Sequence, residues 1–118
     1  MSPFVLILAA ARAAIGAFTW VAPQSAARAF GLEADPKLSY MARLFGARDV
    51  ALAVGVVTTE GSARRSWLAL GLFCDALDFL AAGFAHRDGS MRPQAAMLAG
   101  GAAAAGSVLG AIALTQED

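Results

Sequence analysis

The chain has 118 residues, enough for one domain. Hydrophobic residues make up 58% of it and charged residues only 15%, against about 25% charged in soluble domains, and the mean hydropathy is +0.61. The formal net charge is zero and no basic patch exists, which excludes electrostatic nucleic-acid binding, while the single cysteine, Cys74, excludes an internal disulfide and a thiolate metal cluster.

Four apolar segments follow one another along the chain. We expect them as helices at residues 3–22, 38–59, 66–85 and 93–115. About 20 helical residues are needed to cross the roughly 30 Å hydrocarbon core of a bilayer. The connections are short, so that neighbouring helices run antiparallel. The sequence therefore predicts a single all-α integral membrane domain over residues 1–118, a four-transmembrane-helix up-down-up-down bundle.

The boundaries of these elements have local signals. The first helix stops before Pro23, because proline does not continue a helix. A short interfacial helix is expected over residues 23–30, with Gly31 as its C-cap. Residues 60–65, including Arg64 and Arg65, are expected to form the connection before the third span, and residues 86–90 the connection after it.

Two other interpretations of the apolar segments are less favoured. A removable signal peptide would need a basic start, but no Lys or Arg precedes Phe4, and Arg12 interrupts the apolar stretch. A soluble bundle would need a polar face on each helix. Residues 93–115 carry no charge, and their few polar side chains make no continuous stripe.

Lysine and arginine counts predict the orientation of the bundle. The side that holds the first and third connections carries Arg28, Lys37, Arg87 and Arg92, and the other side carries only Arg64 and Arg65. Cytoplasmic loops are enriched in Lys and Arg. We therefore expect a bacterial inner (plasma) membrane protein with both termini outside.

Six charged residues fall inside the first three predicted spans: Arg12, Arg43, Arg48, Asp49, Asp75 and Asp78. Each charge costs about 2.5–3.5 kcal/mol at the bilayer centre on insertion scales, so the six should be paired. By depth, Asp75 or Asp78, together with Asp49, should contact Arg12 and Arg48. Arg43 and Asp78 match in depth as a second layer towards the cytoplasmic mouth.

Three roles for these charges remain open. Ion pairs can simply fix helix register. Arg12, Arg43 and Arg48 could instead hold the polar group of a ligand, so that the protein is an accessory subunit or a binder of a small amphiphile. In the third case Asp49, Asp75 and Asp78 are catalytic acids or bases of an isomerase or epoxide-opening hydrolase that acts on a lipid-soluble substrate.

Other chemistry lacks residues to carry it. The sole histidine, His86, lies in a predicted loop, so that no Ser/His or Cys/His nucleophile pair is expected, and neither a metal nor a cofactor is indicated. The expected partners are the lipid bilayer, a lipid-like or quinone-like small molecule, and a membrane-protein partner or second copy of the chain.

Glycines are expected to set the helix packing. Gly106 and Gly110 have the small-xxx-small spacing that permits close helix approach, and Gly46 lies in the second span. Together with Gly100 and Gly101, the fourth helix should pack over the charged helices as a lid.

The segment RLFGARD, Arg43 to Asp49, resembles the hallmark of small four-helix membrane proteins of the DoxX-like superfamily, especially an uncharacterised actinobacterial branch. Arg12, the Pro23–Gly31 segment and the acidic pair Asp75 and Asp78 are also similar, so that the resemblance covers nearly the whole chain. It implies an integral four-helix bundle in which Arg43, Gly46, Arg48 and Asp49 are characteristic positions. It implies no established activity for this branch.

Overall fold

The structure is a computed structural model that describes residues 1–117. Its elements, in chain order, are α1 (Pro3–Val21), α2 (Pro23–Ala29), the 3-10 helix η1 (Pro36–Leu38), α3 (Ser39–Val57), α4 (Gly61–Arg87) and α5 (Pro93–Gln116). Residues 1–117 contain no strand, and the predicted all-α fold is confirmed.

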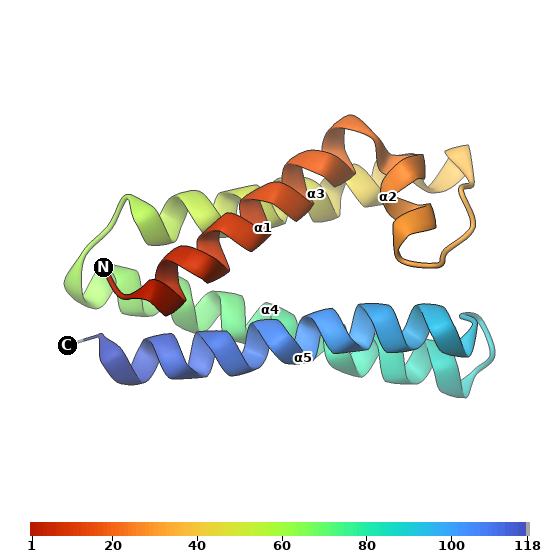
Figure 1. Ribbon diagram of the computed structural model, residues 1–118. Coiled ribbons are helices and arrows are strands. Elements are labelled where there is room, and N and C mark those ends of the chain that lie inside the picture. The colour runs from red at the N-terminus through yellow and green to blue at the C-terminus, as the bar shows by residue number, and fades with distance from the viewer. Residues whose placement is uncertain (118) are drawn as a thin grey trace.

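The four long helices form two layers, each made of two antiparallel helices (Figure 1). One layer is α1 with α3, and the other is α4 with α5; contacts within a layer are extensive and those between layers are few. The layers meet closely at the end that carries both termini. There Val5, Leu8, Val56, Leu68 and Ala113 form a buried apolar cluster. Towards the other end, where α2 and η1 lie, the layers separate.

Two glycines allow the close crossing of α1 and α3. A Cβ atom built on Gly16 would lie 2.6 Å from the carbonyl oxygen of Gly46, and one built on Gly46 would lie 2.6 Å from the carbonyl oxygen of Gly16. No side chain fits into that space, so the two backbones are in direct contact. Gly46 thus belongs to a packing pair whose partner, Gly16, was not predicted.

The short helix after α1 ends as its sequence predicts. Gly31 has a φ of +76°, and its N–H donates to the carbonyl of Arg28 at 2.9 Å. The N–H of Leu32 donates to the carbonyl of Ala27 at 2.8 Å, which completes a Schellman motif. Gly31 is therefore the residue at which the chain turns out of α2.

The predicted start of the third span is wrong by a full helical turn. The helix α4 begins at Gly61, not at residue 66, and ends at Arg87, so Arg64 and Arg65 are helical rather than part of a connection. Arg64 is buried, with 9% of its surface exposed. Both arginines bond carbonyl groups at the ends of other helices, which allows two charged side chains to lie near the start of a helix at this interface.

Three helices are long and apolar enough to cross a membrane, where four were predicted. They are α1, α4 and α5, with mean hydropathies of 1.9, 1.7 and 1.8 over their most apolar stretches. The helix α3 is not among them, because Arg43, Arg48 and Asp49 fall within its 19 residues. By length and composition, three elements thus agree with the predicted membrane-spanning helices.

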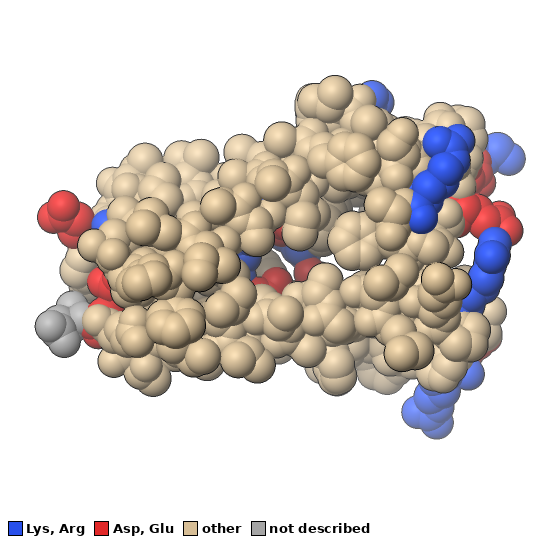
Figure 2. Space-filling view, in the orientation of Figure 1, with Lys and Arg blue, Asp and Glu red and all other residues tan. Residues whose placement is uncertain are grey.

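The outer surface of the molecule is apolar along its middle. Large side chains such as Phe73, Leu77, Phe79 and Phe84 are at least half exposed. Most charged atoms on the face in Figure 2 lie towards the two ends of the molecule. Extended apolar surface of this kind is unfavourable in water and favourable in lipid.

Candidate functional site

A cavity of about 960 Å³ lies between the two helix layers. Alanines from α1, α3, α4 and α5 supply much of its wall, and α2 with the segments around Glu33 and Arg92 lines its wider end. Five charged residues line its inner part: Arg12, Arg48, Asp49, Asp75 and Asp78. Figure 2 shows red and blue atoms deep inside an opening in the otherwise tan middle of the molecule. The volume is within the usual range of ligand sites, about 300–1,000 Å³.

Arg12 and Asp75 form a buried ion pair between the two layers. Nη2 of Arg12, on α1, lies 2.6 Å from Oδ2 of Asp75, on α4. The two side chains are 7% and 13% exposed. This contact confirms the prediction of a buried Arg–Asp pair that joins the first and third long apolar helices.

Two glycines make room for this pair. A Cβ atom on Gly71 of α4 would collide with the guanidinium of Arg12. A Cβ atom on Gly106 of α5 would lie 2.5 Å from Oδ2 of Asp75. Gly106, predicted as a helix-packing residue, thus accommodates a carboxylate. A Cβ atom on Gly110 would make only an ordinary contact, 3.8 Å from the Cβ of Leu72.

Arg48 on α3 forms a bidentate ion pair with Asp78 on α4. Its Nη1 lies 3.1 Å from Oδ1 and its Nη2 lies 2.6 Å from Oδ2 of Asp78. The guanidinium also lies over the ring of Phe45, 4.7 Å from its centroid, a cation–π arrangement. Both side chains of the ion pair are 33% exposed, so this pair is more open than that of Arg12 and Asp75.

Asp49 is the third carboxylate of the cluster and the least well paired. Its side chain is 9% exposed, and its one ion-pair contact is the 3.4 Å approach of Arg48 Nη2 to its Oδ1. The same Nη2 atom makes its shorter bond to Asp78. Arg48 therefore bridges two carboxylates, with Asp78 as its principal partner.

Two N–H groups in the cluster have no hydrogen-bond partner among residues 1–117. They are Nη1 of Arg12 and Nε of Arg48, and both atoms are buried. Buried donors are nearly always bonded in folded proteins, to the protein or to ordered molecules in it. The floor of the cavity thus has spare donors as well as a poorly paired carboxylate.

Arg43 lies apart from the cluster. It is exposed, and its Nε donates to the carbonyl oxygen of Trp20 at 3.0 Å, near the end of α1. Arg48, rather than Arg43, bonds Asp78. Five residues separate the two arginines, which turns them about 140° apart around a helix of 3.6 residues per turn. Depth alone therefore did not identify the partner of Asp78.

Arg64 and Arg65 have contacts that sequence reasoning missed. Arg64 Nε donates to the carbonyl of Val56 at 3.1 Å, at the end of α3. Arg65 Nη1 donates to the carbonyls of Leu114 and Glu117, at 2.8 and 2.6 Å, at the end of α5. The last carbonyls of a helix have no partner within it, and arginine can supply one. The sequence held one signal for these contacts: both arginines lie close to the predicted end of a span, where helix carbonyls need donors.

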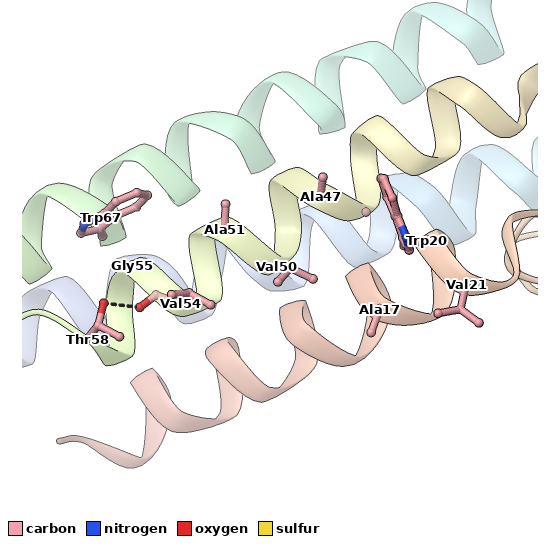
Figure 3. Close-up of a pocket in the computed structure, with 11 residues that line it drawn as sticks. Ala17, Trp20, Val21, Ala47, Val50, Ala51, Val54, Gly55, Thr58 and Trp67 are labelled. Carbon is pink, nitrogen blue, oxygen red and sulfur yellow. Dashed lines mark hydrogen bonds between the residues drawn. The ribbon is translucent and has the colours of Figure 1, made fainter.

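A second hollow, of about 750 Å³, lies on the outer side of α1 and α3 between Trp20 and Trp67 (Figure 3). It is lined by small and apolar side chains and contains no charged residue. The hydroxyl of Thr58 donates to the carbonyl of Val54 at 2.6 Å, so it is already bonded within its own helix. This hollow is apolar, and its lining has no free polar group that could bind or react with a polar ligand.

Comparison with known proteins finds no match to a family model, to a curated protein or to a solved structure. The described residues also contain no group of three or more His, Cys, Asp or Glu side chains placed to hold a metal ion. The interpretation of the site therefore depends on its own geometry and charge.

Proposed function

We propose that this chain is an integral membrane protein whose four long helices all cross the bilayer. Three of them are apolar enough to do so by length and composition. The fourth, α3, lies antiparallel against α1 and directs Arg48 and Asp49 towards the cavity rather than towards lipid. Ionisable residues in membrane helices typically face the protein interior and pair there. The resemblance of residues 43–49 to DoxX-like proteins stays a prediction that fits this arrangement.

We propose further that the protein binds a small amphiphilic molecule in the cavity between the layers. The observation that carries this proposal is the combination of an apolar wall and a charged floor in one space of about 960 Å³. An amphiphile has the same division, an apolar body and a polar head. The charged floor would fix the head and the alanine-rich wall would surround the body, as ligand sites commonly do.

The unpartnered donors support a ligand over a purely structural network. If the charges served only to hold the helices, the buried N–H groups would be bonded within the protein. Nη1 of Arg12 and Nε of Arg48 are not. A ligand oxygen, such as that of a hydroxyl, ester or quinone-like carbonyl, would satisfy such a donor. An accessory role towards another membrane protein would use the same bound molecule.

Native mass spectrometry of the purified protein, released from mild detergent, tests this proposal. We expect a retained molecule of lipid-like mass. Ala102→Phe, which places a ring in the cavity wall on α5, should remove it, whereas Ala111→Phe, on the same helix but outside the cavity lining, should not. Equal retention by both variants would contradict binding in the cavity.

A second function, hydrolysis of an epoxide or isomerisation of a lipid-soluble substrate, is favoured by one observation. Arg48 bridges Asp49 and Asp78, so two carboxyl groups are held at one guanidinium. In an epoxide opening, one carboxylate would take a proton from water as the water oxygen bonds to carbon. The other, protonated, carboxyl would give its proton to the epoxide oxygen as the C–O bond breaks.

Turnover assays separate the two functions. An enzyme should convert an epoxide or alkene lipid, and Asp78→Asn should abolish conversion while the protein still folds. Glu60→Gln, an exposed change at the start of α4, is the matched control. Retention of a lipid without any turnover would favour the binding protein.

A further inference from the structure

We propose that the head group of the bound amphiphile carries a positive charge and that Asp49 is its counter-ion. This inference rests on the proposed binding function and specifies its ligand class: an oxygen of the head group accepts from the spare arginine donors, and a cationic group of the same head lies at Asp49. It follows from the pairing of charges in the floor of the cavity, where one carboxylate is left without a cation of its own.

Two of the three carboxylates each form a close ion pair with an arginine. Asp75 pairs with the guanidinium of Arg12 at 2.6 Å, and Asp78 pairs with that of Arg48 through two hydrogen bonds. Asp49 shares Arg48 only through the longer 3.4 Å contact. With two arginines against three aspartates, the cluster has one negative charge in excess, and the geometry places that excess at Asp49.

Among residues 1–117, the only other cation near Asp49 is Arg12, which already has an acidic partner. The helix α1 contributes Arg12, which is bonded to Asp75, and α5 contributes no charged residue between Pro93 and Gln116. Arg43, on the same helix as Asp49, bonds the carbonyl of Trp20 and is exposed. Asp49 is nevertheless buried, with 7% of the residue exposed, and it lines the cavity.

The wider end of the cavity is lined by charges of both signs. Glu33, Asp35 and Arg92 line it, and Arg92 approaches Glu33 at 3.8 Å. Asp35 accepts a hydrogen bond from the backbone N–H of Lys37. Arg28, Lys37 and Arg87 also lie in or beside the connections at this end, so the excess of negative charge belongs to the floor of the cavity.

A buried carboxylate without a full counter-ion is strongly unfavourable. A cationic head group in the cavity supplies the missing positive charge.

The test uses three amphiphiles with one chain length: dodecyltrimethylammonium, dodecanol and dodecanoate. Binding to the protein in nanodiscs is measured by native mass spectrometry and thermal shift, with empty nanodiscs as the control for partitioning. We expect dodecyltrimethylammonium to bind at least tenfold more tightly than the other two.

The variant Asp49→Asn removes the excess charge and keeps both full ion pairs. It should abolish the preference for the cationic amphiphile, while Glu60→Gln should retain it. If Asp49→Asn does not fold, the ranking of the three amphiphiles by the unmodified protein still decides. Equal or tighter binding of dodecanol would overturn the cationic head group and leave amphiphile binding intact. Failure of all three amphiphiles to bind would overturn both proposals.

Discussion

Gly71 of α4 supplies the space in which the guanidinium of Arg12 lies. A Cβ atom at Gly71 would collide with that guanidinium, which is itself bonded to Asp75. Gly71→Ala should therefore displace the buried ion pair and destabilise the protein by about 1–3 kcal/mol, the usual effect of overpacking a core. Gly83→Ala, on the same helix with nothing within 4 Å of its Cβ position, is the matched control and should be neutral or slightly stabilising. Thermal unfolding in detergent measures both, and equal melting temperatures would show that the pair can move without loss.

The same comparison can be made on α5. A Cβ atom on Gly106 would lie 2.5 Å from the carboxylate of Asp75, whereas one on Gly101 would meet nothing within 4 Å. Gly106→Ala should lower the melting temperature and Gly101→Ala should not. If both changes lowered the melting temperature equally, the space that Gly106 leaves for the carboxylate of Asp75 would not be the reason for the loss.

Removal of one member of the Arg12–Asp75 pair should be strongly destabilising. Arg12→Ala leaves the carboxylate of Asp75 buried without its cation, a change that can cost about 3–5 kcal/mol. The double variant Arg12→Ala, Asp75→Asn should recover much of that loss, because it leaves no unpaired charge. Arg28→Ala, at an exposed position of α2, is the control. Additive losses in the double variant would argue against a direct ion pair.

Arg64→Ala should also be destabilising, although Arg64 was expected in a loop. Its side chain is buried, donates to the carbonyl of Val56 and lies 3.6 Å from Glu117. Loss of a donor to a buried carbonyl costs about 1–3 kcal/mol. Arg87→Ala, in the exposed last turn of the same helix, should have little effect. Melting temperatures in detergent should separate the two variants by several degrees.

Carbonate extraction tests membrane insertion itself. Three helices of sufficient length and apolarity predict that the protein stays in the membrane pellet at alkaline pH. A peripheral control protein in the same preparation should move to the supernatant. Folded protein recovered in the soluble fraction without detergent would contradict the proposed membrane location.

The position of the two termini tests whether α3 crosses the bilayer. Both termini lie at the same end of the molecule, as Figure 1 shows. Four crossings place them on one side of the membrane, and three crossings place them on opposite sides. Reporter fusions at each terminus should both report the outside, because Arg28, Lys37, Arg87 and Arg92 lie in or beside the connections at the other end. Opposite locations would exclude α3 as a span.

Much of the fold follows from apolar segment length and local capping. Pro23 and Gly31 marked the ends of α1 and α2, and the short connections indicated antiparallel neighbours. The start of α4 was missed because two adjacent arginines look like loop residues in sequence. Their hydrogen bonds to carbonyls of α3 and α5 exist only in three dimensions.

The charged cluster was predicted in part for a similar reason. The position of each residue along its helix correctly predicted that Arg12 and Asp75 lie at the same depth, because a helix rises by a fixed distance per residue. Rotation around the helix axis and the separation of the two layers are not readable in that way. Sequence reasoning therefore left both Arg48 and Arg43 as candidates for Asp78, of which the structure selects Arg48. It could not reveal the cavity or the space that Gly71 provides for Arg12.

The Arg12–Asp75 contact joins residues 63 positions apart, and this separation has a consequence for biogenesis. In the proposed four-span arrangement, α1 and α3 enter the membrane first, and Asp49 is then the one acidic residue in the helices beside their arginines, since Asp75 and Asp78 have not yet been inserted. The second hairpin would arrive with two carboxylates and no cation among its residues 66–85. Each half would be electrically incomplete in lipid, and the pairing of their opposite charges would favour docking of the second hairpin on the first.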